Sequence, residues 1–223
     1  MQPIHRVFLD AIADEQRRVA SRRRFLSGSA RLAGGGALAA AFVSVPLVRG
    51  VPSALAQDFA DDLEIANYAL TLEHLEYAFY RDGLKEFDQA AFDEAELPEA
   101  LRKNLGKVRT HEKDHVDFLI AAISDAGGTP VEKATYDFGY DDVEGFLEVA
   151  MALENVGVAA YAGAAPFIQS KDILAAALGI HSVEARHAAY LNDINGELPF
   201  PGSFDKAMSK DEVLEAAGPF ITS

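Results

Sequence analysis

Cysteine and tryptophan are both missing from the 223 residues of this chain. Without cysteine the chain can form neither a disulfide nor a thiolate metal site, so histidine and carboxylate side chains must supply any metal ligands. The chain beyond residue 56 also has no glycine-rich phosphate loop, no Ser-His-Asp order and no basic patch. These absences argue against a nucleotide-binding protein, a serine hydrolase and a nucleic-acid-binding protein.

Charge divides the sequence into two unlike parts. Residues 1–56 contain eight arginines and three acidic residues, a balance of +5, whereas residues 57–223 contain 12 basic and 32 acidic residues, a balance of −20. An acidic surface repels phosphates, keeps a protein in solution and attracts cations. We therefore interpret residues 57–223 as an acidic domain and residues 1–56 as a separate segment.

The first segment has the features of an export signal. Residues 21–26, Ser-Arg-Arg-Arg-Phe-Leu, fit the twin-arginine pattern Ser-Arg-Arg-x-Phe-Leu. The apolar stretch 32–48 is too short and too rich in glycine for a good membrane span. Ala54-Leu55-Ala56 then matches the small-x-small site of signal peptidase. We predict cleavage after Ala56 and transport by the twin-arginine machinery to the periplasm or the outside of a bacterium, with no membrane attachment afterwards; a basic arm or an uncleaved anchor is the alternative.

The predicted domain, residues 57–223, has the apolar periodicity of four long helices. These helices are expected at 58–81, 98–126, 142–168 and 172–195, and glycine at position 83 is expected to end the first. The connection 128–141 is long: its 14 residues reach ~46 Å when extended, enough to cross the length of a bundle. The pattern predicts an all-α antiparallel four-helix bundle with one long crossover between helices 2 and 3, followed by a tail, 197–223, that packs as a strap with a short helix at 210–217.

Each predicted helix carries a glutamate inside its apolar stretch, and a buried carboxylate without a partner is very unfavourable. The second helix contains Glu112-x-x-His115 and the fourth contains Glu184-x-x-His187. Residues three apart lie on one face of a helix, so each motif directs a carboxylate and an imidazole to the same point. The first and third helices each carry a glutamate followed seven residues later by a tyrosine, namely Glu73 with Tyr80 and Glu154 with Tyr161.

This repeated arrangement resembles the di-iron and di-manganese carboxylate proteins of the ferritin-like superfamily. Segments 66–80 and 181–190 look most similar to a bacterial branch that groups exported ferritin-like proteins with desiccation-related proteins. The resemblance implies that Glu73, Glu112 and His115 bind one metal ion, and that Glu154, Glu184 and His187 bind another. It also implies that Glu112 and Glu184 bridge the ions, and that Tyr80 and Tyr161 donate hydrogen bonds to ligand carboxylates.

Two alternatives stay open at this point. Glu76 also lies on the first helix and competes with Glu73 as the ligand. In addition, residues 111–115 spell His-Glu-x-x-His, the zinc metalloprotease signature, in which His111 and His115 bind zinc and Glu112 acts as the base. That interpretation leaves the other three glutamates and His187 without a role.

The resemblance implies a function as an oxidoreductase. Two iron or two manganese ions, or a mixed pair, suit a site rich in carboxylates and poor in histidine. Such a pair would oxidise Fe(II) with O₂ or H₂O₂, or disproportionate peroxide, in protection against stress. The alternative is a structural desiccation or stress-response bundle without turnover, and a homo-oligomer is possible in either case.

Overall fold

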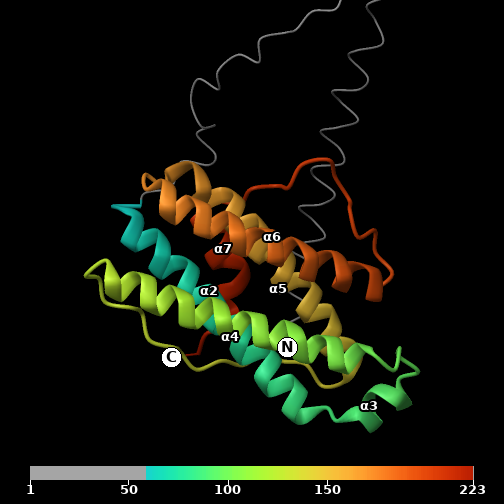
Figure 1. Cartoon of the computed structure of the whole chain (residues 1–223). Coiled ribbons are helices and arrows are strands. Elements are labelled where there is room, and N and C mark those ends of the chain that lie inside the picture. Colours follow the sequence, from blue (N-terminus) through green and yellow to red (C-terminus); the bar gives the residue numbers. More distant parts are fainter. Residues whose placement is uncertain (1–58, 223) are drawn as a thin grey trace, which may run out of the picture.

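The computed structural model describes residues 59–222, and the predicted export signal at residues 1–56 lies outside this range. Within it, four long helices dominate (Figure 1): α2 (Asp62–Glu86), α4 (Leu101–Asp125), α5 (Val143–Ala164) and α6 (Lys171–Ile194). Two shorter helices, α3 (Gln89–Glu94) and α7 (Lys210–Ala217), and two 3₁₀ turns, η3 (Ala165–Phe167) and η4 (Gly218–Phe220), complete the elements. The described part of the chain contains no strand, so the predicted all-α class is confirmed.

The long helices form a bundle of two tightly packed pairs, α2 with α4 and α5 with α6. Contacts between α2 and α5 join the two pairs. The crossover between α4 and α5 runs along the outside of the bundle in extended conformation (Figure 1). The predicted bundle with a long connection between its second and third long helices is therefore confirmed.

Three of the long helices begin directly after a small polar residue whose side chain caps the helix N-terminus. Asp61, Asp142 and Ser170 precede α2, α5 and α6, and each side chain accepts a hydrogen bond from a backbone N–H three residues further on. Before α7, Ser209 and Glu212 form a capping box. Each cap satisfies backbone donors that the first helical turn leaves free, and so fixes the residue at which the helix begins.

The predicted end of the first helix is wrong, because α2 continues through Gly83 to Glu86. Gly83 is buried against the ring of Phe146 on α5, and a Cβ at this position would overlap that ring. The Phe146 ring in turn stacks on Phe79, with ring centroids 4.8 Å apart. This glycine therefore permits a close approach between α2 and α5 and does not end the helix.

The predicted boundaries also miss detail in two connections. The first connection contains the short helix α3, which is capped by Asp88 and buries Phe92. The third long helix ends at Ala164 rather than near Ile168, because Pro166 falls in the 3₁₀ turn η3 that follows it.

The crossover and the tail hold each other on the bundle surface. Tyr136 and Ile221 form an isolated antiparallel bridge, and the Thr222 N–H donates to the Thr135 carbonyl at 2.9 Å. Helix α7 packs against α5 and buries Val213 there. The tail thus packs as the predicted strap. Across residues 59–222, none of the helices combines the length and the apolar character required to cross a lipid bilayer.

A pair of glycine substitutions tests this account of helix packing. Gly83→Ala should lower the free energy of unfolding by about 1–3 kcal/mol, because the added methyl group must displace the Phe146 ring. Gly106→Ala on α4 should raise it by about 0.5–1 kcal/mol, since the new Cβ would meet no atom within 4 Å apart from its chain neighbours and its own helix backbone, and alanine favours the helix. Urea denaturation of both variants measures the difference, and equal shifts would contradict the packing role of Gly83.

Candidate metal centre

Seven ionisable side chains meet in the interior between the four long helices. Both histidines are nearly buried, with 9% of His115 and 5% of His187 exposed. The five carboxylates are buried completely or almost completely, namely Glu73, Glu76, Glu112, Glu154 and Glu184. Such a group is stable only when hydrogen bonds, protons or cations compensate its charge.

The geometry forms two overlapping sets of metal-ligand atoms. Glu73 and His115 join Glu112 and Glu184 in one set, and Glu154 and His187 join the same two glutamates in the other. Within each set the four ligand atoms lie within 4.8 Å of one another. The structure thus brings together all six residues predicted as ligands and gives both sets the two glutamates predicted to bridge. Their binding of metal stays a prediction.

His115 directs its Nδ1 atom at the first set of carboxylates. This atom lies 3.1 Å from Glu73 Oε2, 3.1 Å from Glu112 Oε2 and 3.2 Å from Glu184 Oε1. Burial by itself would lower the pKa of His115, but the three carboxylates outweigh burial and raise that pKa to about 12. A proton on Nδ1 therefore supplies positive charge at a point where carboxylate oxygens converge, as a bound cation would.

His187 has the corresponding position in the second set. Its Nδ1 lies 3.0 Å from Glu112 Oε1 and 3.2 Å from Glu154 Oε2. Burial opposes protonation here too, yet the two carboxylates raise the pKa of His187 to about 10. The histidines of the two Glu-x-x-His motifs therefore both direct Nδ1 at the carboxylates, one from α4 and the other from α6.

His111 contacts the far side of His187. Its Nδ1 lies 2.9 Å from His187 Nε2, and the two rings stack with centroids 5.2 Å apart. Burial, together with the charge on His187, lowers the pKa of His111. A neutral His111 accepts a hydrogen bond from the Nε2–H of His187, and this leaves Nδ1 of His187 directed at the carboxylates.

This position of His111 does not favour the zinc metalloprotease alternative. Both sets of ligand atoms exclude His111, whereas Glu112, the base in that alternative, lies in both sets. The sequence places His111 about 100° from Glu112 around the helix, which indicates a surface position or a supporting one. The helical pattern of the sequence gives no sign that His111 contacts His187.

The two predicted tyrosines donate hydrogen bonds across the bundle. Tyr80 on α2 donates to Glu154 Oε1 on α5 at 2.6 Å, and Tyr161 on α5 donates to Glu73 Oε1 on α2 at 2.6 Å. Each tyrosine therefore orients the glutamate of the neighbouring helix rather than the one on its own helix. The crossed pairs arise because α2 and α5 run antiparallel with the same seven-residue spacing in both.

Glu76 is a fifth buried carboxylate beside the two sets. Burial, followed by the nearby carboxylates of Glu184 and Glu154, raises the pKa of Glu76 well above its usual range. A Cβ at Gly157 would lie only 3.0 Å from Glu76 Oε1 and 3.3 Å from Glu184 Oε2, so glycine leaves room for both side chains. Glu76 lies in neither set of ligand atoms, which supports Glu73 as the ligand from the first long helix.

Several carboxylate oxygens in the cluster are left without a hydrogen bond. Among the described residues, Glu112 Oε1 and both oxygens of Glu184 are buried and have no hydrogen-bond partner. The histidine nitrogens near them form their hydrogen bonds with other carboxylate oxygens. These free oxygens belong to the two glutamates shared by both sets, so the donor set fits cations that bind between the glutamates.

Removal of the hydroxyl group of Tyr80 or of Tyr161 should lower the stability of the fold measurably. Tyr161→Phe and Tyr80→Phe should each lower the free energy of unfolding by about 1–3 kcal/mol, because a buried carboxylate oxygen loses its donor. Tyr190→Phe is the control, since this hydroxyl only accepts an exposed hydrogen bond from Asn104. Denaturation of the three variants after dialysis against a chelator checks the prediction, and equal stabilities would contradict it.

Comparison with known proteins agrees with the fold. The sequence model of a family described as "Ferritin-like domain" matches residues 61–197, which include all four long helices. The chain is 26% identical over 164 residues to the protein rds1 of Schizosaccharomyces pombe, covering 73% of this chain but only 40% of the yeast protein. Its fold is similar to the crystal structure of a conserved hypothetical protein, rv2844, from Mycobacterium tuberculosis, with a TM-score of 0.52 and 19% identity over 64% of this chain and 96% of the other.

Proposed function

Because this chain belongs to the ferritin-like domain family, we propose that its buried glutamates and histidines hold two iron or two manganese ions, or one of each. The observation that supports this proposal best is that two sets of ligand atoms share Glu112 and Glu184. The shared glutamates also carry the three carboxylate oxygens that are buried without a hydrogen bond among the described residues. Carboxylate and imidazole ligands in this proportion suit iron or manganese better than copper.

Charge supports two ions rather than one. The four proposed ligand carboxylates, Glu73, Glu112, Glu154 and Glu184, are all fully buried and together carry a charge of −4 when ionised. With both histidines as neutral ligands, two divalent cations neutralise this charge, whereas a single divalent cation leaves half of it to be compensated by protons in a medium of low dielectric constant.

We propose that the centre is an oxidoreductase site. A pair of redox-active ions held by these residues would supply redox chemistry toward O₂ or H₂O₂, with Fe(II) oxidation or peroxide disproportionation as the reaction. The protein's own residues bind and orient the ligands. His111 holds the imidazole of His187, and Tyr80 and Tyr161 hold the carboxylates of Glu154 and Glu73.

The location of the protein is a separate proposal. The twin-arginine pattern at residues 21–26 and the Ala-x-Ala site that ends at Ala56 support export to the periplasm or the cell exterior. Because twin-arginine transport carries folded proteins, the ions would be taken up before export.

A structural stress-response bundle is the second candidate function. Complete burial of the four glutamates favours it, because metal ions enclosed in this way stabilise a fold whether or not they react. Turnover separates the two candidates. Only the oxidoreductase consumes Fe(II) or peroxide, whereas the structural bundle holds metal without turnover or holds none.

The decisive test changes the shared glutamates. The unmodified protein should bind about two Fe or Mn ions per chain. Glu112→Gln combined with Glu184→Gln should abolish most of this binding and lower the rate of Fe(II) oxidation at least ~100-fold, since both ions lose a ligand. Glu144→Gln combined with Glu148→Gln is the matched control, because both side chains lie exposed on α5. Elemental analysis gives the metal content, and O₂ consumption gives the rate.

Each outcome of this test leads to a different conclusion. Two bound ions with no Fe(II) or peroxide turnover would favour the structural candidate. A folded protein that binds no metal would refute the dinuclear centre. One zinc ion per chain that depends on His111 would revive the metalloprotease alternative.

The hydrogen bond between His111 and His187 gives a further prediction. His111→Phe keeps an aromatic ring but removes the acceptor, so Mn²⁺ affinity at the site that includes His187 should fall about 10–100-fold. His111→Asn, which retains an acceptor, should restore part of the affinity. His181→Phe on α6 is the control, because His181 lies outside both ligand sets. Chelator competition measures the affinities, and an unchanged His111→Phe variant would contradict a positioning role.

A further inference from the structure

Glu76 is the one carboxylate of the central cluster that has no role in the proposed metal centre. It is buried, with 3% of the residue exposed, and it lies in neither set of ligand atoms. A buried carboxylate lowers the stability of a fold unless a proton, a hydrogen-bond donor or a cation compensates its charge. The neighbours of Glu76 therefore determine whether it can bind an ion.

Glu76 lies opposite a glycine of the other half of the bundle. Gly157 comes three residues after the glutamate of α5, as Glu76 comes three residues after Glu73 on α2. The two positions therefore correspond, and one half has a carboxylate where the other half has no side chain. A Cβ at Gly157 would lie 3.0 Å from Glu76 Oε1. The Glu76 carboxylate thus extends into the space that glycine leaves beside α5.

The same glycine brings Glu76 close to one of the two shared glutamates. The Cβ position at Gly157 lies 3.3 Å from Glu184 Oε2, so Oε1 of Glu76 and Oε2 of Glu184 approach one point. The other oxygen of Glu184, Oε1, lies 3.2 Å from Nδ1 of His115. Oε2 of Glu184 is buried without a hydrogen-bond partner among the described residues. A cation between the two carboxylates would give this oxygen a partner.

The hydrogen-bond donors of the centre are engaged by the other carboxylates. Both tyrosine hydroxyls donate to the ligand glutamates of α2 and α5. The Nδ1 atoms of the two histidines form their hydrogen bonds with Glu73, Glu112 and Glu154. These four side chains therefore leave no donor for Glu76.

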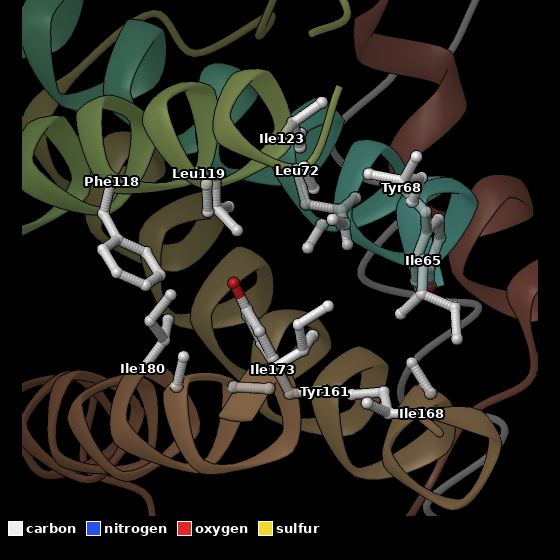
Figure 2. A pocket seen from close by; sticks show the side chains of 18 of the residues that line it. Ile65, Tyr68, Leu72, Phe118, Leu119, Ile123, Tyr161, Ile168, Ile173 and Ile180 are labelled. Carbon is white, nitrogen blue, oxygen red and sulfur yellow. The ribbon is translucent and has the colours of Figure 1, made fainter. Parts of the chain in front are cut away.

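The cavity between the four long helices does not compensate Glu76 either. It has a volume of about 270 Å³, and Figure 2 shows Leu119 of α4 and Ile173 of α6 among its lining side chains. The described residues that line it are almost all apolar, and they include neither a basic residue nor Glu76. The cavity thus offers this carboxylate no positive charge.

We propose that Glu76 is a fifth ligand carboxylate of the metal centre, which binds an ion together with Glu184. The inference rests on the proposed dinuclear centre and adds one ligand to it, while Glu73 keeps its place in the first set. With both histidines neutral, five ionised carboxylates carry a charge of −5. One divalent and one trivalent ion match this charge, whereas two divalent ions fall short of it. Glu76 therefore gives the centre a preference for a trivalent ion at one position.

Mn²⁺ binding to the full chain tests the ligand role. Glu76→Gln keeps the shape of the side chain but removes its charge, and it should lower the affinity for at least one of the two ions at least ~10-fold. Glu144→Gln is the control, because Glu144 lies exposed on α5, and it should leave both affinities unchanged. Chelator competition measures the affinities.

Urea denaturation in the presence of a chelator separates a binding defect from a folding defect. Without metal, Glu76→Gln should unfold at a higher urea concentration than the unmodified protein, because the variant no longer buries this carboxylate among four others. Weaker metal binding by a more stable variant cannot come from a damaged fold.

The reduction potential of the iron-loaded protein tests the charge argument. Loss of an anionic ligand destabilises Fe(III) relative to Fe(II), so Glu76→Gln should raise the potential while Glu144→Gln leaves it unchanged. An anaerobic redox titration followed by absorbance measures this shift.

Three results would overturn the inference, and they differ in what they say about the centre. Two ions bound by Glu76→Gln with unchanged affinity and potential would leave the dinuclear centre intact and show that residue 76 only fills space. Equal losses in Glu76→Gln and Glu144→Gln would show a general effect of charge rather than a ligand. Failure of the unmodified protein to bind any metal would refute both the fifth ligand and the dinuclear centre.

Discussion

The structure depends on the compensation of negative charge at the centre of the bundle. Five buried glutamates face two histidines there, so positive charge from protons or cations must be present for the helices to close. His115 and His187 supply part of it through Nδ1 atoms placed among the carboxylates. Hydrogen bonds from Tyr80 to Glu154 and from Tyr161 to Glu73, together with the contact between His111 and His187, then hold these groups in place.

The two halves of the bundle support each other at this centre. Each half contributes a helix with a glutamate and a tyrosine, and a helix with Glu-x-x-His. Because each tyrosine bonds the glutamate of the other half, neither half has a complete centre by itself. The shared use of Glu112 and Glu184 in both ligand sets has the same consequence. Formation of the site therefore requires that all four long helices pack together.

The interior of the bundle differs on the two sides of the carboxylate cluster. On one side, aromatic rings pack closely, as in the stack of Phe79 on Phe146 that Gly83 permits. On the other side, alanines and branched aliphatic residues of the four helices leave a cavity of about 270 Å³. On the first side, large aromatic rings fill the space between the helices. On the second side, small side chains leave part of that space open. One side is thus closely packed, and the other contains a cavity lined in part by Tyr161, whose hydroxyl donates to Glu73.

The sequence by itself determined the helical class, the long crossover and the face that each Glu-x-x-His pair occupies, because helical periodicity and this spacing act within single helices. The roles of Glu73 and Glu154 came from the family resemblance, and the choice between Glu73 and Glu76 stayed open. Only the tertiary structure decided which residues meet across helices. It paired Tyr80 with Glu154 and His111 with His187. It also continued α2 through Gly83 and left the cavity beside Tyr161. Spacing along one helix defines the face on which a residue lies. The partner of that residue depends on the register, direction and distance of the neighbouring helix, and packing of the whole bundle sets all three.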